Sequence, residues 1–274
     1  MALNSVNTNT AAIIALQSLN RTNAELLGVQ KRVSTGFRIS DAKEDGAAFS
    51  IAQGLRGDMK GYEAIKEQLS KAKGTMAVAN DVAKSISDTL ASVRSVIVKL
   101  ADDNTTGSQR TQYENDYAAL KTEIANFISN ASFNGANLLN TTTDLNVIST
   151  LNGTSMTLNA FNLTTDVSNN LTAATSATLA RALLTATGGL TVAGGNIGVA
   201  MSSLGADTRA LDNQITFIGV LRDATEEGVG AIVDADLAKE SARLQSLQVR
   251  QQLGTQTLNI ANQSPNILLS LFGN

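Results

Sequence analysis

One run of apolar residues constrains the fold of this chain more than any other feature of its sequence. From Ile65 to Leu100 the apolar positions follow one another at alternating spacings of four and three residues, without a slip. The run comprises Ile65, Leu69, Ala72, Met76, Ala79, Ala83, Ile86, Leu90, Val93, Ile97 and Leu100. This heptad pattern is typical of a helix that buries one continuous stripe against partner helices. It predicts a helix roughly 50 Å long, at about 1.5 Å per residue.

A second apolar series with the same spacing follows a short polar break. The segment Asp102–Gly107 interrupts the first helix, and Tyr113, Tyr117, Leu120, Ile124 and Phe127 then resume the period. A turn-like Ser-Phe-Asn-Gly sequence follows at residues 132–135. The two series predict a helical hairpin. We expect its packing to depend on Ile86, Leu90, Val93, Ile97, Ile124 and Phe127.

Both ends of the chain carry weaker heptad patterns. The N-terminal positions are Ala12, Leu16, Leu19, Asn23, Leu26, Gln30 and Val33, and the C-terminal positions are Leu237, Leu244, Leu247, Gln251, Gly254, Leu258 and Ala261. Amides and a glycine interrupt these stripes, so each helix is too weak to be stable alone in water. Each arm therefore needs a partner, which is either the other arm or further copies of the chain. A third stripe at Leu211, Ile215, Ile218, Val229 and Ile232 would close a helical bundle.

The middle of the chain differs from both ends in its composition. Residues 141–200 hold only three charged side chains, Asp144, Asp166 and Arg181, and are rich in Thr, Asn, Ser and Gly. This composition favours short strands, turns and loops over helix. The predicted fold class is therefore mainly α, a long helical bundle or coiled coil built from the two arms, with a small β-hairpin and loop insert.

Composition argues against most enzymes. The 274 residues include no histidine and no cysteine, which removes the usual general base, thiol nucleophiles and thiolate metal sites. A net charge of −3 without a basic cluster gives no electrostatic footprint for nucleic acid. The sequence contains no run of 18 apolar residues, so we expect no membrane-spanning segment. We predict no catalytic residue, no cofactor and no metal. Two acidic groups, Asp41 with Glu44 and Asp45, and Asp234 with Asp236, are interpreted as helix caps, with Asp41 and Glu44 at the spacing of a capping box.

Several motifs together resemble one family. They are Asn4-Ser-Val-Asn-Thr-Asn-Thr, the run Arg32–Asp45 (Arg-Val-Ser-Thr-Gly-Phe-Arg-Ile-Ser-Asp-Ala-Lys-Glu-Asp), Phe133-Asn-Gly-Ala-Asn-Leu-Leu, Ile232-Val-Asp-Ala-Asp-Leu-Ala-Lys-Glu, and Ala261-Asn-Gln-Ser-Pro-Asn. In this order they resemble bacterial flagellins, especially the short flagellins of alphaproteobacteria. The resemblance implies the structural subunit of the flagellar filament, the helical propeller for swimming, and not an enzyme.

The resemblance also implies a division of the chain into domains. Residues 1–40 and 236–274 would form an inner coiled-coil domain, and residues 41–140 and 201–235 an outer core domain. Residues 141–200 would form a small β and loop segment on the outer core. The inner seam would contain Leu16, Leu19, Leu26, Leu244, Leu247 and Leu258. The loop between the domains would contain Arg32, Gly36, Arg38, Asp41 and Asp45.

The resemblance finally implies partners and a location. The family is exported through the flagellar type III apparatus without a cleaved signal, is bound by an export chaperone, and forms an extracellular homopolymer with a filament cap and hook–filament junction proteins. The family's Toll-like receptor epitope would fall on Ser92, Arg94, Ser95 and Val96, with Glu123 further on. Where the family's epitope has Arg, Glu and Leu, this chain has Ser92, Ser95 and Val96. Strong charged contacts are therefore lost, and we expect the receptor to recognise this chain weakly.

Two other classes of protein remain as alternatives. A hook–filament junction protein would share the flagellin-like ends, although the full set of motifs argues against it. An enzyme inserted in the central segment is disfavoured, since residues 141–200 hold only three charged side chains and no histidine.

Overall fold

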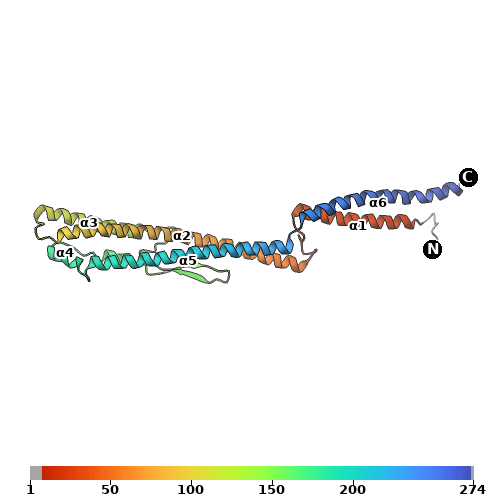
Figure 1. Cartoon of the computed structure of the whole chain (residues 1–274). Helices are drawn as coiled ribbons and strands as arrows, with labels where there is room; N and C mark the ends of the chain where they lie inside the picture. The colour runs from red at the N-terminus through yellow and green to blue at the C-terminus, as the bar shows by residue number, and fades with distance from the viewer. Residues whose placement is uncertain (1–7, 273–274) are drawn as a thin grey trace. The chain divides into compact units, whose positions relative to one another are not determined.

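The chain is mainly helical, as predicted. The computed structural model describes the backbone of residues 8–272 and the side chains of residues 8–263 (Figure 1). The elements are α1 (Thr10–Thr35), α2 (Gly46–Leu100), α3 (Gly107–Asn130), β1 (Leu145–Ile148), β2 (Ser155–Leu158), the π-helix η1 (Thr164–Ser168), α4 (Ala177–Leu184), α5 (Gly189–Val233) and α6 (Leu237–Phe272). The opening motif at Asn4 begins outside the described residues.

These elements form two compact units. The smaller unit combines Met1–Gly57 with Ala224–Asn274, so it joins the two ends of the chain. The larger unit is the continuous segment Asp58–Asp223. Both boundaries fall inside long helices, α2 and α5. Each unit is therefore described separately below.

The larger unit has one hydrophobic core, and the heptad stripe of α2 runs through it. All eleven predicted stripe positions from Ile65 to Leu100 are buried. Tyr117, Ile124 and Ile128 of α3 belong to the same core, and so do Leu204, Leu211 and Ile218 of α5. The predicted helical hairpin is present, because α2 ends at Leu100 and α3 begins at Gly107. Arg110 holds the connection by donating from Nε to the carbonyl of Thr105, at 2.9 Å, and from Nη2 to the carbonyl of Leu100, at 3.1 Å.

A small antiparallel hairpin lies on the larger unit. Its register pairs Leu145 with Leu158 and Ile148 with Ser155. Polar contacts attach the hairpin region to α5. The Gln214 amide donates to the carbonyl of Ser149 at 2.8 Å, and the backbone N–H of Asn159 donates to Asp207 Oδ2 at 2.9 Å. The predicted β-hairpin is thus confirmed within residues 141–200.

The last third of this central segment is helical, contrary to the prediction. Helix α4 covers Ala177–Leu184, and α5 begins at Gly189 rather than near residue 201. Burial explains the difference, since Leu190, Ala193, Ile197, Ala200 and Leu204 all face the core. Their apolar contacts outweigh the low helix propensity of the intervening Gly and Thr residues. The side chain of Ser176 caps α4 by accepting from the N–H of Leu179, at 3.2 Å.

The region Ala177–Val233 also contains a stretch apolar enough to cross a membrane by length and composition, with a mean hydropathy of 1.2. The apolar side chains listed above for α5 are packed in the core of the larger unit. The most apolar 18-residue window of this region is 28% buried inside the protein, and a single helix of this kind is weak evidence for a membrane span.

Candidate assembly site

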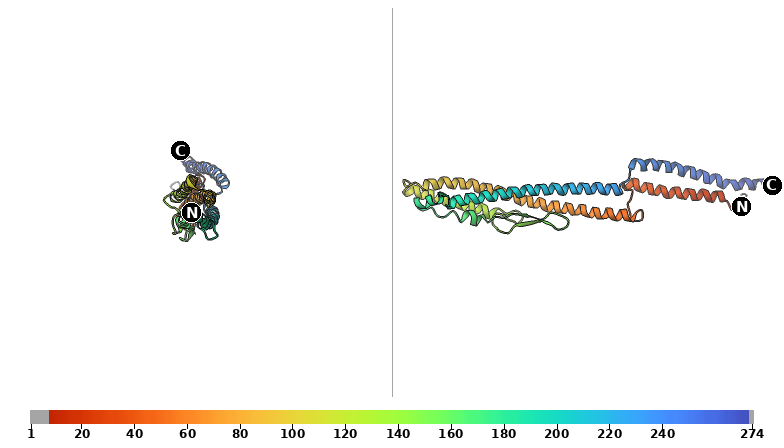
Figure 2. Two further views of the ribbon diagram at one scale, coloured as in Figure 1. Left: turned by 90° about the vertical axis from the view of Figure 1, so that its left-hand side faces the viewer. Right: turned by 60° about the horizontal axis from the view of Figure 1, so that its bottom comes forward.

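The smaller unit is built around the pairing of the two terminal arms. Helices α1 and α6 come from opposite ends of the sequence and lie side by side (Figures 1 and 2). Leu26, Val29 and Leu247 form the buried cluster between them, with Val33 and Leu244 packed partly buried against it. The sequence allowed two partners for each arm, the other arm or further copies of the chain. The structure shows the first of these, because the two arms pair within a single chain.

The seam differs in detail from the predicted one. Leu26 and Leu247 are buried, whereas Leu19, Leu244 and Leu258 are partly buried and Leu16 is 47% exposed. Val29 is fully buried and was missed, because a strict alternation of spacings selects Gln30, which is exposed. A valine three residues after Leu26 was the available signal, since positions i and i+3 share a helix face.

Polar groups lie within this seam as well. The amide of Gln251 donates to the amide oxygen of Asn23 at 2.8 Å. Further along, the amide of Asn9 donates to the carbonyl of Ala261 at 2.7 Å. An amide pair at a core position of a coiled coil specifies register at a cost in stability. Two of the interruptions in the heptads, Asn23 and Gln251, are thus explained as a matched pair of amides.

A glycine sets how closely the two helices approach. A Cβ atom at Gly254 of α6 would lie 3.1 Å from Cδ1 of Leu19 of α1. The leucine therefore occupies the space that the missing side chain leaves. A Cβ at position 254 would therefore require the Leu19 side chain to shift by a few tenths of an ångström.

Most apolar side chains of the arms remain outside the seam. Eight of them are 47–70% exposed in the single chain, namely Ile13, Ile14, Leu16, Leu27, Leu237, Val249, Leu253 and Ile260. A second apolar face of α6, at Val249, Leu253 and Ile260, is therefore open to solvent. Exposed apolar side chains in such number on two helices indicate a surface for further contacts.

The loop between α1 and α2 is bound to the end of α5 by main-chain hydrogen bonds. Gly36 ends α1 with φ of 75°, a left-handed conformation that glycine adopts without strain. The N–H of Ala235 donates to the carbonyl of Gly36 at 2.9 Å, and the N–H of Arg38 donates to the carbonyl of Val233 at 2.7 Å. Arg38 Nη2 adds a bond to the carbonyl of Ile232, at 2.5 Å. The loop and the start of α6 are thereby linked.

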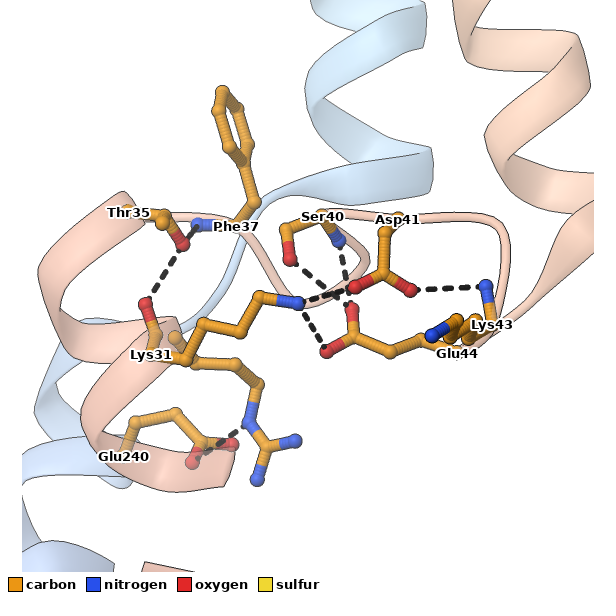
Figure 3. Close-up of polar contacts among 9 residues, drawn as sticks. Lys31, Thr35, Phe37, Ser40, Asp41, Lys43, Glu44 and Glu240 are labelled. Carbon is orange, nitrogen blue, oxygen red and sulfur yellow. Dashed lines mark hydrogen bonds and ion pairs between the residues drawn. The ribbon is translucent and has the colours of Figure 1, made fainter. Parts of the chain in front are cut away.

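Charged side chains complete the loop (Figure 3). Lys31 Nζ lies 2.5 Å from Asp41 Oδ2 and 3.1 Å from Glu44 Oε1. The hydrogen bond from Lys31, helped by the N–H of Lys43, holds the pKa of Asp41 below its usual value. The N–H of Ser40 is the main cause of a lowered pKa at Glu44, with Lys31 contributing. Both carboxylates in turn raise the pKa of Lys31.

A second ion pair lies between the arms. Arg32 Nε of α1 is 3.2 Å from Glu240 Oε2 of α6, and both side chains are largely withdrawn from solvent (Figure 3). Such a shielded pair is costly to break, since either group alone would be left without its counter-charge. Arg32 therefore contributes to the pairing of the arms in addition to its place at the start of the loop.

Acidic residues cap the starts of α2 and α6, as predicted, but the predicted capping box is absent. Asp236 Oδ1 accepts from the N–H of Lys239 at 3.1 Å, at the start of α6. Asp45, not Asp41, caps α2, because its Oδ1 accepts from the N–H groups of Ala47 and Ala48 at 3.1 and 3.0 Å. The expected box at Asp41 is therefore wrong. Glu44 instead accepts from the N–H of Ser40, at 2.8 Å.

Comparisons with known proteins agree with this architecture. The model of the bacterial flagellin N-terminal helical region matches residues 6–144, and that of the C-terminal helical region matches residues 189–272. The chain belongs to the bacterial flagellin family. Flagellin FljM of Caulobacter vibrioides is 41% identical across 99% of this chain and 100% of that relative. A flagellin of Brucella melitensis is 35% identical across 98% and 99%.

One solved structure supports the fold alone. A putative flagellar hook-associated protein of Vibrio parahaemolyticus aligns with a TM-score of 0.56 at 14% identity, over 70% of this chain and 100% of that one.

As a flagellin, the chain is a structural subunit that polymerises into the flagellar filament, the propeller for swimming, and is not an enzyme. Among the described residues no cluster of acidic side chains has the geometry of a metal site.

The remaining predicted residues of this flagellin lie in the larger unit. Ile86, Leu90, Val93, Ile97 and Ile124 are buried in its core, and Phe127 packs partly buried against it. On the surface of α2, Ser92, Arg94 and Ser95 are exposed, and Glu123 is exposed on α3. Val96 is only 8% exposed, so its side chain offers little to a binding partner.

Proposed function

We propose that α1 and α6 form the inner domain of this flagellin and complete their apolar core only against neighbouring copies. The carrying observation is the imbalance between the buried and the exposed apolar side chains of the arms. One short cluster at Leu26, Val29 and Leu247 is buried, while eight apolar side chains remain exposed. Burial of apolar area contributes about 25 cal/mol per Å², so repeated contacts between copies stabilise the arms in the polymer.

The same imbalance accounts for subunits that fold without assembling prematurely. A single α1–α6 pair has a small core interrupted by the Asn23–Gln251 amides. Its stability alone is low compared with that of the larger unit, whose core follows α2 from Ile65 to Leu100. Contacts that repeat head to tail without closing produce a filament. In this proposal assembly waits for copies already fixed at the end of the filament.

The domain assignment follows the compact units rather than the expected boundaries. The inner coiled-coil domain takes α1 and α6, together with the loop that contains Arg32, Gly36, Arg38, Asp41 and Asp45. The outer core takes residues 58–223, with the β1–β2 hairpin on it. Supporting this division, the loop's main-chain bonds to Val233 and Ala235 fall inside the smaller unit.

We extend the proposal to partners and location on the basis of family membership. The chain is exported by the type III apparatus with a chaperone, and meets the filament cap and hook–filament junction proteins in an extracellular filament. Recognition by the flagellin-sensing Toll-like receptor is weak. Supporting this, Ser92 and Ser95 carry no charge and Val96 is withdrawn from solvent. A receptor-reporter dose response equal to that of a strong agonist flagellin would contradict this part.

Seeded polymerisation tests the role of the exposed apolar face. Ile260 is 70% exposed, so Ile260→Asp should leave the monomer folded while preventing it from pelleting after short filament seeds are added. Asn259→Asp is the matched control, since it adds the same charge at an exposed polar neighbour and should assemble like the parent. Equal assembly of both variants would refute the proposed use of this face.

A minor-component role is the competing function, because hook–filament junction proteins share this fold. Quantifying the chain in isolated filaments separates the two. A filament subunit forms the bulk of the polymer, whereas a junction protein is present in a few copies. If the chain is present in only a few copies per filament, and if it stays monomeric when seeds are added, the junction protein would be favoured.

A further inference from the structure

One groove of the larger unit lies along one edge of the β-hairpin. It has a volume of about 480 Å³ and is lined on one side by Gln68, Lys71, Ala72 and Thr75 of α2. All four residues of β1 line the other side, while no residue of β2 does. Side chains of a strand alternate between its two faces. Four consecutive lining residues therefore mean that the groove runs along the outer edge of β1.

The main chain at this edge is free to pair. The N–H of Ser149 donates to the carbonyl of Thr154 at 2.8 Å, so position 149 faces β2. Because successive residues in a strand direct their polar groups to opposite sides, Val147 also faces β2. Asn146 and Ile148 then point their N–H and C=O groups away from it. Within the described residues neither backbone makes a hydrogen bond outside the hairpin ladder.

The groove also offers apolar contacts at its rim. Phe133, from the turn after α3, and Ile148 both line it and are both partly exposed. A strand edge, a facing helix and apolar side chains between them are the elements by which an added strand is bound in β-augmentation. The main-chain bonds give such binding its affinity, and the flanking side chains give it selectivity.

The charge of the lining indicates the chemistry of the occupant. Lys71 is the charged residue among those that line the groove, and no carboxylate lines it. Its pairing with Glu67, at 3.0 Å, is between two well-exposed side chains on one helix. Such surface pairs contribute little and exchange easily. Lys71 is therefore available to an acidic side chain that enters the groove.

We propose that this groove binds an extended peptide segment of another protein, which pairs with the edge of β1 and places an acidic side chain beside Lys71. This activity belongs to the surface of the larger unit. It does not depend on the assembly role proposed above for the arms.

A peptide titration on the full-length monomer tests the proposal. The probe is a short blocked peptide that alternates valine and threonine around a central aspartate, followed by NMR of the Asn146 and Ile148 amides. Saturable shifts of these two amides are expected, with a central-lysine peptide binding at least about tenfold more weakly. Equal binding of the two peptides would overturn the acidic preference. No saturable shift at millimolar peptide would overturn the site.

Two proline variants distinguish edge pairing from general binding to the hairpin. Ile148→Pro removes an outward N–H, which a strand edge tolerates because the hairpin ladder does not use it. Ser155→Pro makes the same change directly opposite, on the far edge of β2. Only Ile148→Pro should weaken binding, by about tenfold or more. Equal loss in both variants would overturn edge pairing.

A second copy of the chain is the competing occupant, and hydrogen exchange in filaments identifies it. If the groove is filled between subunits, the Asn146 and Ile148 amides will become protected on polymerisation, and the filament will no longer bind the peptide. That result would mean that the groove binds a neighbouring subunit and not a segment of another protein. Unprotected amides and retained binding in filaments would support the proposal. Peptide binding and hydrogen exchange at the groove do not depend on whether Ile260→Asp prevents polymerisation.

Discussion

The heptad stripe of α2 and the seam between α1 and α6 begin as similar sequence patterns and end in different states. In the larger unit, each of the eleven apolar positions from Ile65 to Leu100 is buried. In the smaller unit, predicted positions such as Leu16 and Leu237 are about half exposed, and a hydrogen-bonded amide pair sits in the seam. A complete stripe produces a core within one chain. An interrupted stripe leaves part of its apolar surface for neighbouring subunits.

The strongest test of this comparison truncates one buried and one exposed side chain within α2. Ile97 is fully buried and its neighbour Val98 is 55% exposed. Ile97→Ala should lower the free energy of unfolding by about 2–5 kcal/mol, since it removes apolar contacts and leaves a cavity. Val98→Ala should change it by no more than about 0.5 kcal/mol. Denaturant unfolding followed by circular dichroism measures both, and similar losses would mean that the stripe is not the core.

The corresponding change in the seam should affect assembly and leave the larger unit intact. Leu247 is 2% exposed, and Leu247→Asp places an unpaired charge in the small cluster between the arms. We expect the critical concentration for seeded polymerisation to rise at least about tenfold, equivalent to about 1.4 kcal/mol. The unfolding midpoint of the larger unit should not move.

The exposed neighbour of this leucine provides the control. Gln248→Asp introduces the same charge outside the cluster and should polymerise with nearly the parent's critical concentration. A loss of the larger unit's cooperative unfolding in Leu247→Asp would show that the two cores are not separable, and the comparison would fail.

The amide pair tests whether the interruptions in the seam are functional. Replacing either Asn23 or Gln251 by alanine leaves its partner without the 2.8 Å hydrogen bond and should cost about 0.5–1.5 kcal/mol. Replacing both by leucine should stabilise the pair of arms and relax its register. Hydrogen exchange of the α1 and α6 amides in the monomer measures the stability. A double-mutant cycle with no coupling between the two positions would argue against a register role.

The contrast between the two units also explains what the sequence could predict. The α2 core was predictable because every stripe residue obeys one strict period. Val29 was missed because the seam shifts by one residue where Gln30 would continue the pattern. The pairing of Phe37 with Asp234 is a long-range main-chain contact, for which neither segment carries a local signal. The start of α5 was missed because burial, not propensity, stabilises it. Helix α4 is rich in Ala and Leu, which favour helix, and was missed because the segment around it is dominated by Thr, Asn and Gly.

The smallest expected effect concerns the loop charges, and its direction follows from the pKa shifts. Lys31 and the local N–H groups lower the pKa of Asp41 and of Glu44, so both carboxylates stabilise the folded loop when ionised. This contribution is complete above the ordinary carboxyl range, near about pH 4. It is lost as the pH falls through the lowered values. The raised pKa of Lys31 has the opposite sign, so its contribution is lost only as the pH rises above about 10.4.

Exchange of the Ser40 and Lys43 amides, measured as the pH is lowered, follows this loss directly. After correction for intrinsic rates, their protection should fall below about pH 4. The amide of Lys239, which donates to Asp236 outside the Lys31 network, serves as the reference. Asp41→Asn should remove part of the pH dependence at Lys43 while leaving that at Lys239 unchanged. If the parent and the variant lose protection along the same curve, the Lys31 network does not hold the loop, and the main-chain bonds of Gly36 and Arg38 suffice.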